Sequence, residues 1–118
     1  MAVKSTNGKM IVGALAIQNK STATAVAGAA TLSKQAGTVT SEALTTAAGA
    51  EYTLTLTNTF VAAASVVLAS VQNGDNSTAG AYVTSVTPAA GSVVIKVKNG
   101  HASSALNGTI KIAFLVIP

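Results

Sequence analysis

The sequence contains no cysteine, no tryptophan and no arginine, and its only acidic residues are Glu42, Glu51 and Asp75. Without cysteine, a disulfide framework and a thiolate zinc site are both excluded. One histidine and three carboxylates in 118 residues leave little material for acid–base or nucleophilic chemistry. The composition therefore predicts that the protein is not an enzyme, with no catalytic, cofactor-binding or metal-binding residues.

Large side chains are also scarce, because only four residues are aromatic whereas 24 are alanine. A chain of this length can build one domain around one core. A core of small side chains is marginally stable by itself, which points to support from a partner surface. The longest strongly apolar run, residues 60–71, is shorter than the roughly 20 residues of a membrane helix, so no transmembrane segment is predicted.

The most regular feature present is an alternation of apolar and polar residues with period two, as in half-buried strands. In residues 51–58, Tyr52, Leu54 and Leu56 share one face and threonines the other. Residues 92–98 place two valines and an isoleucine inward and Lys96 and Lys98 outward. Residues 109–117 have an inward face of Ile110, Ile112, Phe114 and Val116. The other face of this third strand becomes apolar at Leu115 and Ile117, which predicts that both faces are covered there.

Weaker strand patterns cover residues 10–17, 30–33, 37–40, 65–72 and 81–87. The pairs Asn73-Gly74 and Asn107-Gly108 predict tight turns with positive φ, and residues 41–50 are compatible with a single helical turn. About eight short strands with little helix predict an all-β fold, a β-sandwich or jelly roll of antiparallel strands. A local echo supports this, since Thr-Thr-Ala-Ala-Gly at 45–49 and Thr-Pro-Ala-Ala-Gly at 87–91 each precede a strand that ends in asparagine.

The N-terminal residues 1–9 are small, polar and unpatterned, which predicts an extended arm ahead of a single domain of residues 10–118. We expect the arm to dock on a neighbouring molecule through Lys4 and Lys9, although a frayed terminus is the simpler alternative. The apolar residues 10–17 after these lysines weakly resemble a signal peptide. We interpret them as a first strand, because the run is short and the segment before it is long and polar.

Three small groups of polar residues have simpler interpretations than chemistry. His101 is close to Ser103 and Ser104, but neighbours in one loop do not make a nucleophile and its base. The loop around Asp75 offers a single carboxylate, whereas calcium loops gather several. Lys96 and Lys98 share a strand face, which Lys111 joins if the strands pair, but the chain lacks the arginines and stacking aromatics of a nucleic-acid site.

Several segments in order carry a resemblance: AGTVT at 36–40, YTLTLTN at 52–58, AAGSVVIKVKN at 89–99 and IAFLVI at 112–117. Over roughly residues 21–118 the chain resembles small all-β structural proteins of tailed bacteriophages. Such proteins serve as capsid decoration, or cement, proteins, and similar domains are found at fibre ends.

The resemblance implies a virion component on the capsid surface, a homotrimer whose partner is the major capsid protein. We expect Lys4, Lys9, Leu115 and Ile117 to contribute to subunit or capsid interfaces. We expect no nucleic acid, membrane, cofactor or small-molecule substrate among its partners. The alternatives are a fibre-tip or receptor-binding module of a phage, and a secreted bacterial adhesin domain if residues 10–17 belong to a signal peptide.

Overall fold

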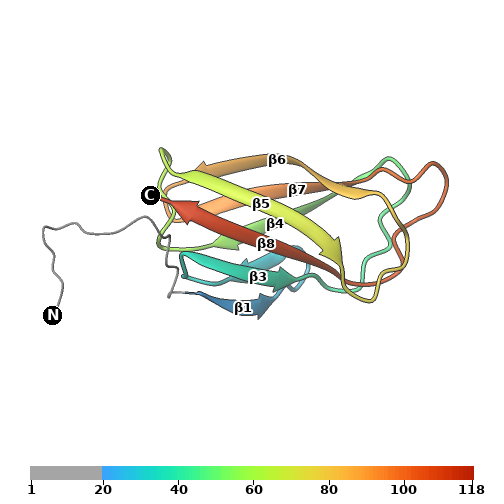
Figure 1. Ribbon diagram of the computed structural model, residues 1–118, viewed down its shortest axis with the longest axis horizontal. Helices are drawn as coiled ribbons and strands as arrows, with labels where there is room; N and C mark the ends of the chain where they lie inside the picture. The colour runs from blue at the N-terminus through green and yellow to red at the C-terminus, as the bar shows by residue number, and fades with distance from the viewer. Residues whose placement is uncertain (1–19) are drawn as a thin grey trace, which may run out of the picture.

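The computed structural model describes residues 20–118, which form eight β-strands (Figure 1). The strands are β1 (Lys20–Thr24), β2 (Ala29–Thr31), β3 (Ala36–Thr40), β4 (Glu51–Thr57), β5 (Val66–Asn73), β6 (Ala81–Ala89), β7 (Ser92–Asn99) and β8 (Ile110–Ile117). Strands β2 to β8 correspond to strands predicted from the sequence, with shifts of a few residues at their ends. Strand β1 was not predicted, and the strand expected at residues 10–17 lies outside the described residues.

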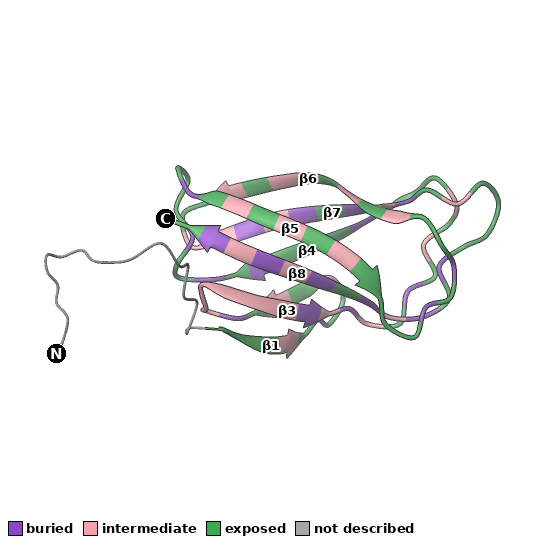
Figure 2. Ribbon diagram, in the orientation of Figure 1, coloured by how far each residue is buried: buried purple, intermediate pink, exposed green. Residues whose placement is uncertain are grey.

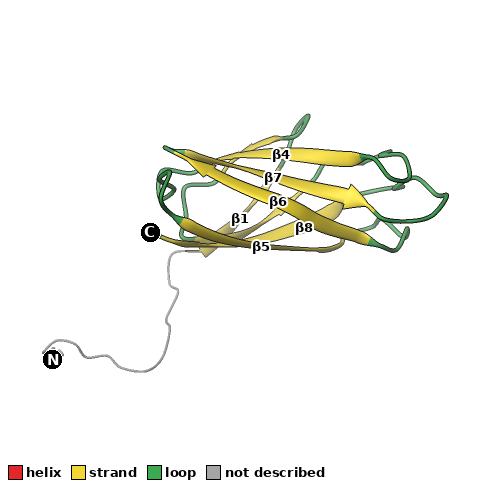
Figure 3. Ribbon diagram, turned by 90° about the horizontal axis from the view of Figure 1, so that it is seen from above, coloured by secondary structure: helices red, strands yellow, loops and turns green. Residues whose placement is uncertain are grey.

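The strands form two four-stranded sheets in a sandwich-like arrangement, with orders β1-β3-β8-β5 and β2-β4-β7-β6. Figure 3 shows the two layers facing each other. The all-β class is therefore confirmed, but the expectation of only antiparallel strands is wrong. Strand β1 pairs parallel with β3, and β2 pairs parallel with β4. The reason is that the chain changes sheets after each of its first three strands, so strands two apart in sequence run in the same direction.

The core lies between the two sheets and is built by the alternating strands. Along β4 and β7 every second side chain is buried, and Leu54, Leu56 and Ile95 are fully inaccessible. The inward face of β8 is buried in the same way, as its colours in Figure 2 show. Each fully buried Leu or Ile stabilises the fold by about 1.5–3 kcal/mol relative to an exposed one. The inward faces predicted for these three strands are confirmed.

The predicted echo is a structural repeat at opposite ends of the β4–β7 pair. Gly49 and Gly91 both have a φ of 80°, and both have open space where a side chain would start, so backbone conformation explains these glycines. Asn99 pairs with the Gly49 turn, because the Gly49 N–H donates to the Asn99 carbonyl at 2.8 Å. Asn58 pairs with the other turn, donating its N–H to the Gly91 carbonyl at 3.0 Å. Each strand therefore ends against the turn that begins its neighbour.

Two local predictions are wrong. Neither Gly74 nor Gly108 has a positive φ; each instead lies so close to neighbouring atoms, of Thr109 and of Asn76 respectively, that a β-carbon would collide. Residues 41–50 contain no helical turn: apart from one turn, in which Ala50 donates its N–H to the Ala47 carbonyl at 2.9 Å, their backbone bonds mainly to other segments. Leu44, for example, donates its N–H to the Gly108 carbonyl at 2.9 Å and is buried.

Candidate interface on one sheet face

The outer face of the β1-β3-β8-β5 sheet carries large apolar side chains where β8 ends and β5 begins. The strand register pairs Val66 with Ile117 and Leu68 with Leu115. Val66, Leu68 and Ile117 are 53%, 55% and 46% exposed. We call Val66, Leu68, Leu115 and Ile117 the apolar patch. Isolated exposed apolar residues are ordinary, but adjacent ones on a flat sheet face are typical of an interaction surface.

Leu115 and Ile117, which the sequence singled out, therefore lie together on this patch. Among residues 20–118 nothing covers the outer face of β8 at its C-terminal end, since Ile117 is exposed and Leu115 is only partly buried. Contact with a partner remains a prediction for both residues. Lys4 and Lys9 lie outside the described residues.

Sequence reasoning missed Val66 and Leu68. Residues 66–68 are three consecutive apolar residues, so the alternation that separates an inward from an outward face is absent at this point. The structure resolves the ambiguity, because Val67 is partly buried against the core while its two neighbours face outward. The available signal was the length of the apolar run beside the predicted C-terminal strand, but the pairing of β5 with β8 depends on tertiary structure.

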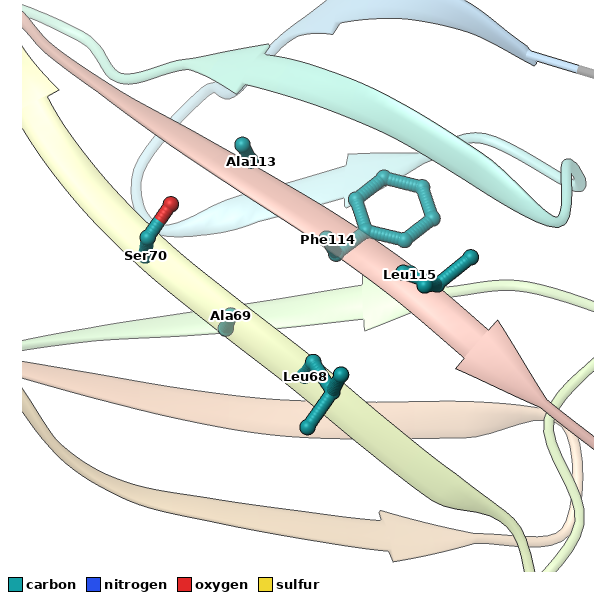
Figure 4. Close-up of a pocket in the computed structure, with 6 residues that line it drawn as sticks. All are labelled: Leu68, Ala69, Ser70, Ala113, Phe114 and Leu115. Atoms are coloured by element: carbon teal, nitrogen blue, oxygen red, sulfur yellow. The ribbon is translucent and has the colours of Figure 1, made fainter. Parts of the chain in front are cut away.

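Small side chains around the apolar patch leave two grooves on the same sheet face. The groove between β5 and β8 has a volume of about 260 Å³, and Leu68, Ser70, Ala113 and Leu115 line it (Figure 4). A second groove of about 470 Å³ lies along β1 and β3. The first groove is lined by aliphatic side chains and Phe114 with a single hydroxyl, whereas sites for small ligands combine apolar walls with several convergent polar groups. Its shape and chemistry fit a protein surface better than a small molecule.

The outer face of the other sheet is different in character. Strand β4 presents Thr53, Thr55 and Thr57, and the neighbouring β7 presents Lys96 at the level of Thr53. Lys96 and Lys98 share the outer face of β7 as expected, but Lys111 does not join them, because β7 and β8 do not pair. The reason is that residues 100–109 carry the chain from one sheet to the other, which places β7 and β8 in different layers. The outer face of this second sheet is thus mainly polar, although it includes Tyr82 of β6, which is 48% exposed.

Long loops meet at the end of the sandwich away from the C-terminus (Figure 1). His101 lies in one of them, and its Nδ1 accepts hydrogen bonds from the backbone N–H groups of Ser103 at 3.1 Å and Ser104 at 2.9 Å. The imidazole therefore bonds the backbone of these serines and shapes the loop. This agrees with the interpretation of His101 as a loop residue and not as a general base.

Asp75 links two of these loops. Its Oδ1 accepts hydrogen bonds from the Thr109 backbone N–H at 2.5 Å and from the Thr109 hydroxyl at 2.9 Å. These bonds, the backbone one first, hold the pKa of the Asp75 carboxyl below its usual value. Within residues 20–118 no group of three or more His, Asp or Glu residues is placed to hold a metal ion.

Tyr52 connects the β3–β4 loop to the core. Its hydroxyl donates to Glu42 Oε1 at 2.9 Å while its ring is buried. Burial raises the pKa of the Tyr52 hydroxyl well above its usual range, and the hydrogen bond and negative charge of Glu42 add to the effect. The Tyr52 hydroxyl thus stays protonated and donates to the Glu42 carboxylate, and the role of this pair is structural.

In the part of the chain that the structure describes, no helix is long and apolar enough to cross a membrane. Comparison of the sequence with protein-family models and with curated proteins, and of the structure with solved structures, gave no match.

Proposed function

We propose that this chain is a capsid decoration protein of a tailed bacteriophage, which binds the outer surface of the shell as a homotrimer and stabilises it by contacts with the major capsid protein. The observation that carries the proposal is the exposed apolar patch on one face of a small β-sandwich whose other face is mainly polar. A small domain that binds flat on another protein needs one apolar face for the contact and one polar face that stays in water. Of the two all-β folds expected from the sequence, we propose that the chain adopts the β-sandwich and not the jelly roll.

The composition of the surface supports this role. Alanine, threonine and valine have few rotamers, so little side-chain entropy is lost when they are packed against a partner. Modest contacts of this kind suffice when many copies bind one particle and when each trimer engages its site at several points. Neither a deep pocket nor a charged cluster is required for such binding.

A fibre-tip or receptor-binding module is the second candidate, and the rigid loop end favours it. Thr78 Oγ1 donates to the Ala105 carbonyl at 2.7 Å, and Leu106 N donates to the Thr46 carbonyl at 2.9 Å, so three separate loops are bonded together. Tyr82, which is 48% exposed, packs against Gly100 beside them. Loops fixed in this way could present a recognition surface to a host molecule.

Electron microscopy of the assembled virus distinguishes the two candidates. Density of this sandwich over the capsomers, with the β1-β3-β8-β5 sheet against the shell or a neighbouring copy, supports decoration. Density at the tip of a fibre with the loop end pointing outward supports the second candidate. A particle that contains the protein at neither place contradicts both.

A further inference from the structure

One of the four sheet edges lacks the features that normally prevent edge-to-edge pairing. Strand β2 has only three residues, β6 contains Pro88 and a bulge after Val83, and β1 is short and carries Lys20. Strand β5 has eight residues with no charge, no proline and no register shift. Such an edge offers unpaired backbone groups to another strand.

The hydrogen-bond pattern shows which backbone groups of β5 have no partner among residues 20–118. Val116 donates its N–H to the Gln35 carbonyl at 2.7 Å, so the even-numbered residues of β8 bond toward β3. Bonding directions alternate along an antiparallel ladder, so Leu115 bonds its partner Leu68 on β5. The backbone of Ala69, the next residue, therefore points to the free edge, as do those of the alternate residues on either side.

We propose that residues 10–17 of a second copy of this chain add to the free edge of β5 as an exchanged strand, beside the apolar patch. This segment, MIVGALAI, has eight residues with no charge or proline, which suits a strand placed next to an apolar surface. The proposal deepens the homotrimer part of the proposed function and identifies its contact. It does not depend on binding to a shell.

Chain length argues that the donor is another copy. Strand β1 lies at the opposite edge of the sheet from β5, so the position next to β5 is four strand spacings, roughly 19 Å, from Lys20. The three residues back to Ile17 span at most about 10 Å. A strand that includes all of residues 10–17 therefore cannot pair with β5 of its own molecule.

The surroundings of the two edges also favour β5 over β1 as acceptor. Outer side chains near β1 are Lys20, Thr22 and Thr38, whereas those near β5 are Val66 and Leu68. Residues 10–17 are apolar at alternate positions of both kinds, so a strand of these residues buries more apolar surface beside Val66 and Leu68 than beside β1. Because donor and acceptor surfaces differ, the contact is head-to-tail, and such contacts form a ring such as a trimer when the rotation between copies closes.

Two variants separate donor from acceptor. Deletion of residues 1–17 removes the donor strand but leaves β5 intact. Ala69→Pro removes an edge-facing N–H, blocks strand addition and spares the β5–β8 hydrogen bonds; Ala69→Val, which keeps the N–H, is the matched control. By light scattering without shells, we expect the wild type and Ala69→Val to be trimers and both test variants to be monomers.

Mixing provides the decisive measurement, because each test variant retains what the other lacks. The truncated chain offers a free β5 edge and Ala69→Pro offers the donor strand, so the mixture should form a 1:1 dimer. Retained trimers of either variant, a monomeric wild type, or a mixture that stays monomeric would overturn the inference. If circular dichroism shows that Ala69→Pro is unfolded, tagged truncated chain mixed with wild type decides: it must enter wild-type oligomers. A monomeric chain that still decorates shells would leave the capsid proposal standing.

Discussion

At the scale of single residues, buried asparagines organise the ends of the strands. The Oδ1 of Asn58 accepts the Phe60 N–H, and the Oδ1 of Asn99 accepts the His101 N–H, each two residues further along the chain. Their Nδ2 groups donate to backbone carbonyls of other loops, for example from Asn58 to Lys34 at 2.7 Å. Where β4 and β7 end, backbone N–H and C=O groups of the loops have no strand to pair with. The side chains of Asn58 and Asn99 supply hydrogen-bond partners for these groups instead.

Replacing Asn99 by alanine should lower the free energy of unfolding by about 3 kcal/mol, because its Nδ2 donates to two carbonyls, those of Thr46 at 3.0 Å and Ser104 at 2.8 Å, which then lose a partner. Chemical denaturation measures this change. Gln72→Ala, which removes an exposed amide from β5, is the control and should change stability by less than about 0.5 kcal/mol. Equal effects of the two variants would show that burial of Asn99 has no energetic importance.

Asp75 should make stability depend on pH in the acid range. Its pKa is lower in the folded protein than the ordinary value of 3.8, so its contribution is complete above that value and is lost as the pH falls through the folded pKa. Denaturation curves of the wild type and Asp75→Asn should differ at pH 7 and converge once the pH has fallen through the folded pKa. A difference that stays constant with pH would contradict this account.

At the scale of elements, the sequence predicted strands best where one face is buried and the other is wet. Strands β4, β7 and β8 meet this condition and were predicted almost to the residue. Strand β1, KSTAT, is exposed or only partly buried along its length, and its strand conformation depends on pairing with β3. No local pattern marks such a strand, and none reveals that β1 and β3 run parallel.

The candidate interface was also predictable only in part, where the alternation along one strand identifies its outward residues. The outward apolar residues Leu115 and Ile117 follow from the alternation along β8 alone. Val66 and Leu68 complete the patch only because β5 pairs with β8, and pairing between strands about 50 residues apart in the chain is a tertiary property. The bonded loops around His101 and Asp75 depend on the same kind of long-range contact.

Replacing Leu115 and Ile117 together by serine should weaken assembly much more than it weakens the fold. Both side chains are outside the core, so we expect a loss of less than about 1.5 kcal/mol in the free energy of unfolding. Loss of two apolar contacts at an interface should weaken self-association or shell binding at least about tenfold. Thr55→Ser with Thr57→Ser, on the opposite face, is the control. Parallel losses of stability and assembly would identify Leu115 and Ile117 as ordinary structural residues.

At the scale of the whole molecule, charge should assist docking by the N-terminal arm. The net charge of +4 comes from lysine alone, and two lysines precede the first apolar segment. Lys4→Ala with Lys9→Ala should weaken binding to isolated shells at low salt, and the difference should disappear near 1 M salt, where the screening length is about 3 Å. Lys96→Ala with Lys98→Ala removes the same charge from the polar face. If both pairs weaken binding equally, net charge matters and the arm does not.

The position of β8 has a consequence for how the chain is made. In its sheet, β8 lies between β3 and β5 and pairs with both, so these two strands have no hydrogen-bonded contact with each other without it. The ribosome delivers β8 after all the other strands, because synthesis runs from the N-terminus. The second sheet can pair earlier, but the first must wait until residues 110–117 have left the exit tunnel. Folding of this sandwich is therefore completed only once β8 has emerged, and a nascent chain that lacks β8 exposes the edges of β3 and β5 that β8 covers in the folded protein.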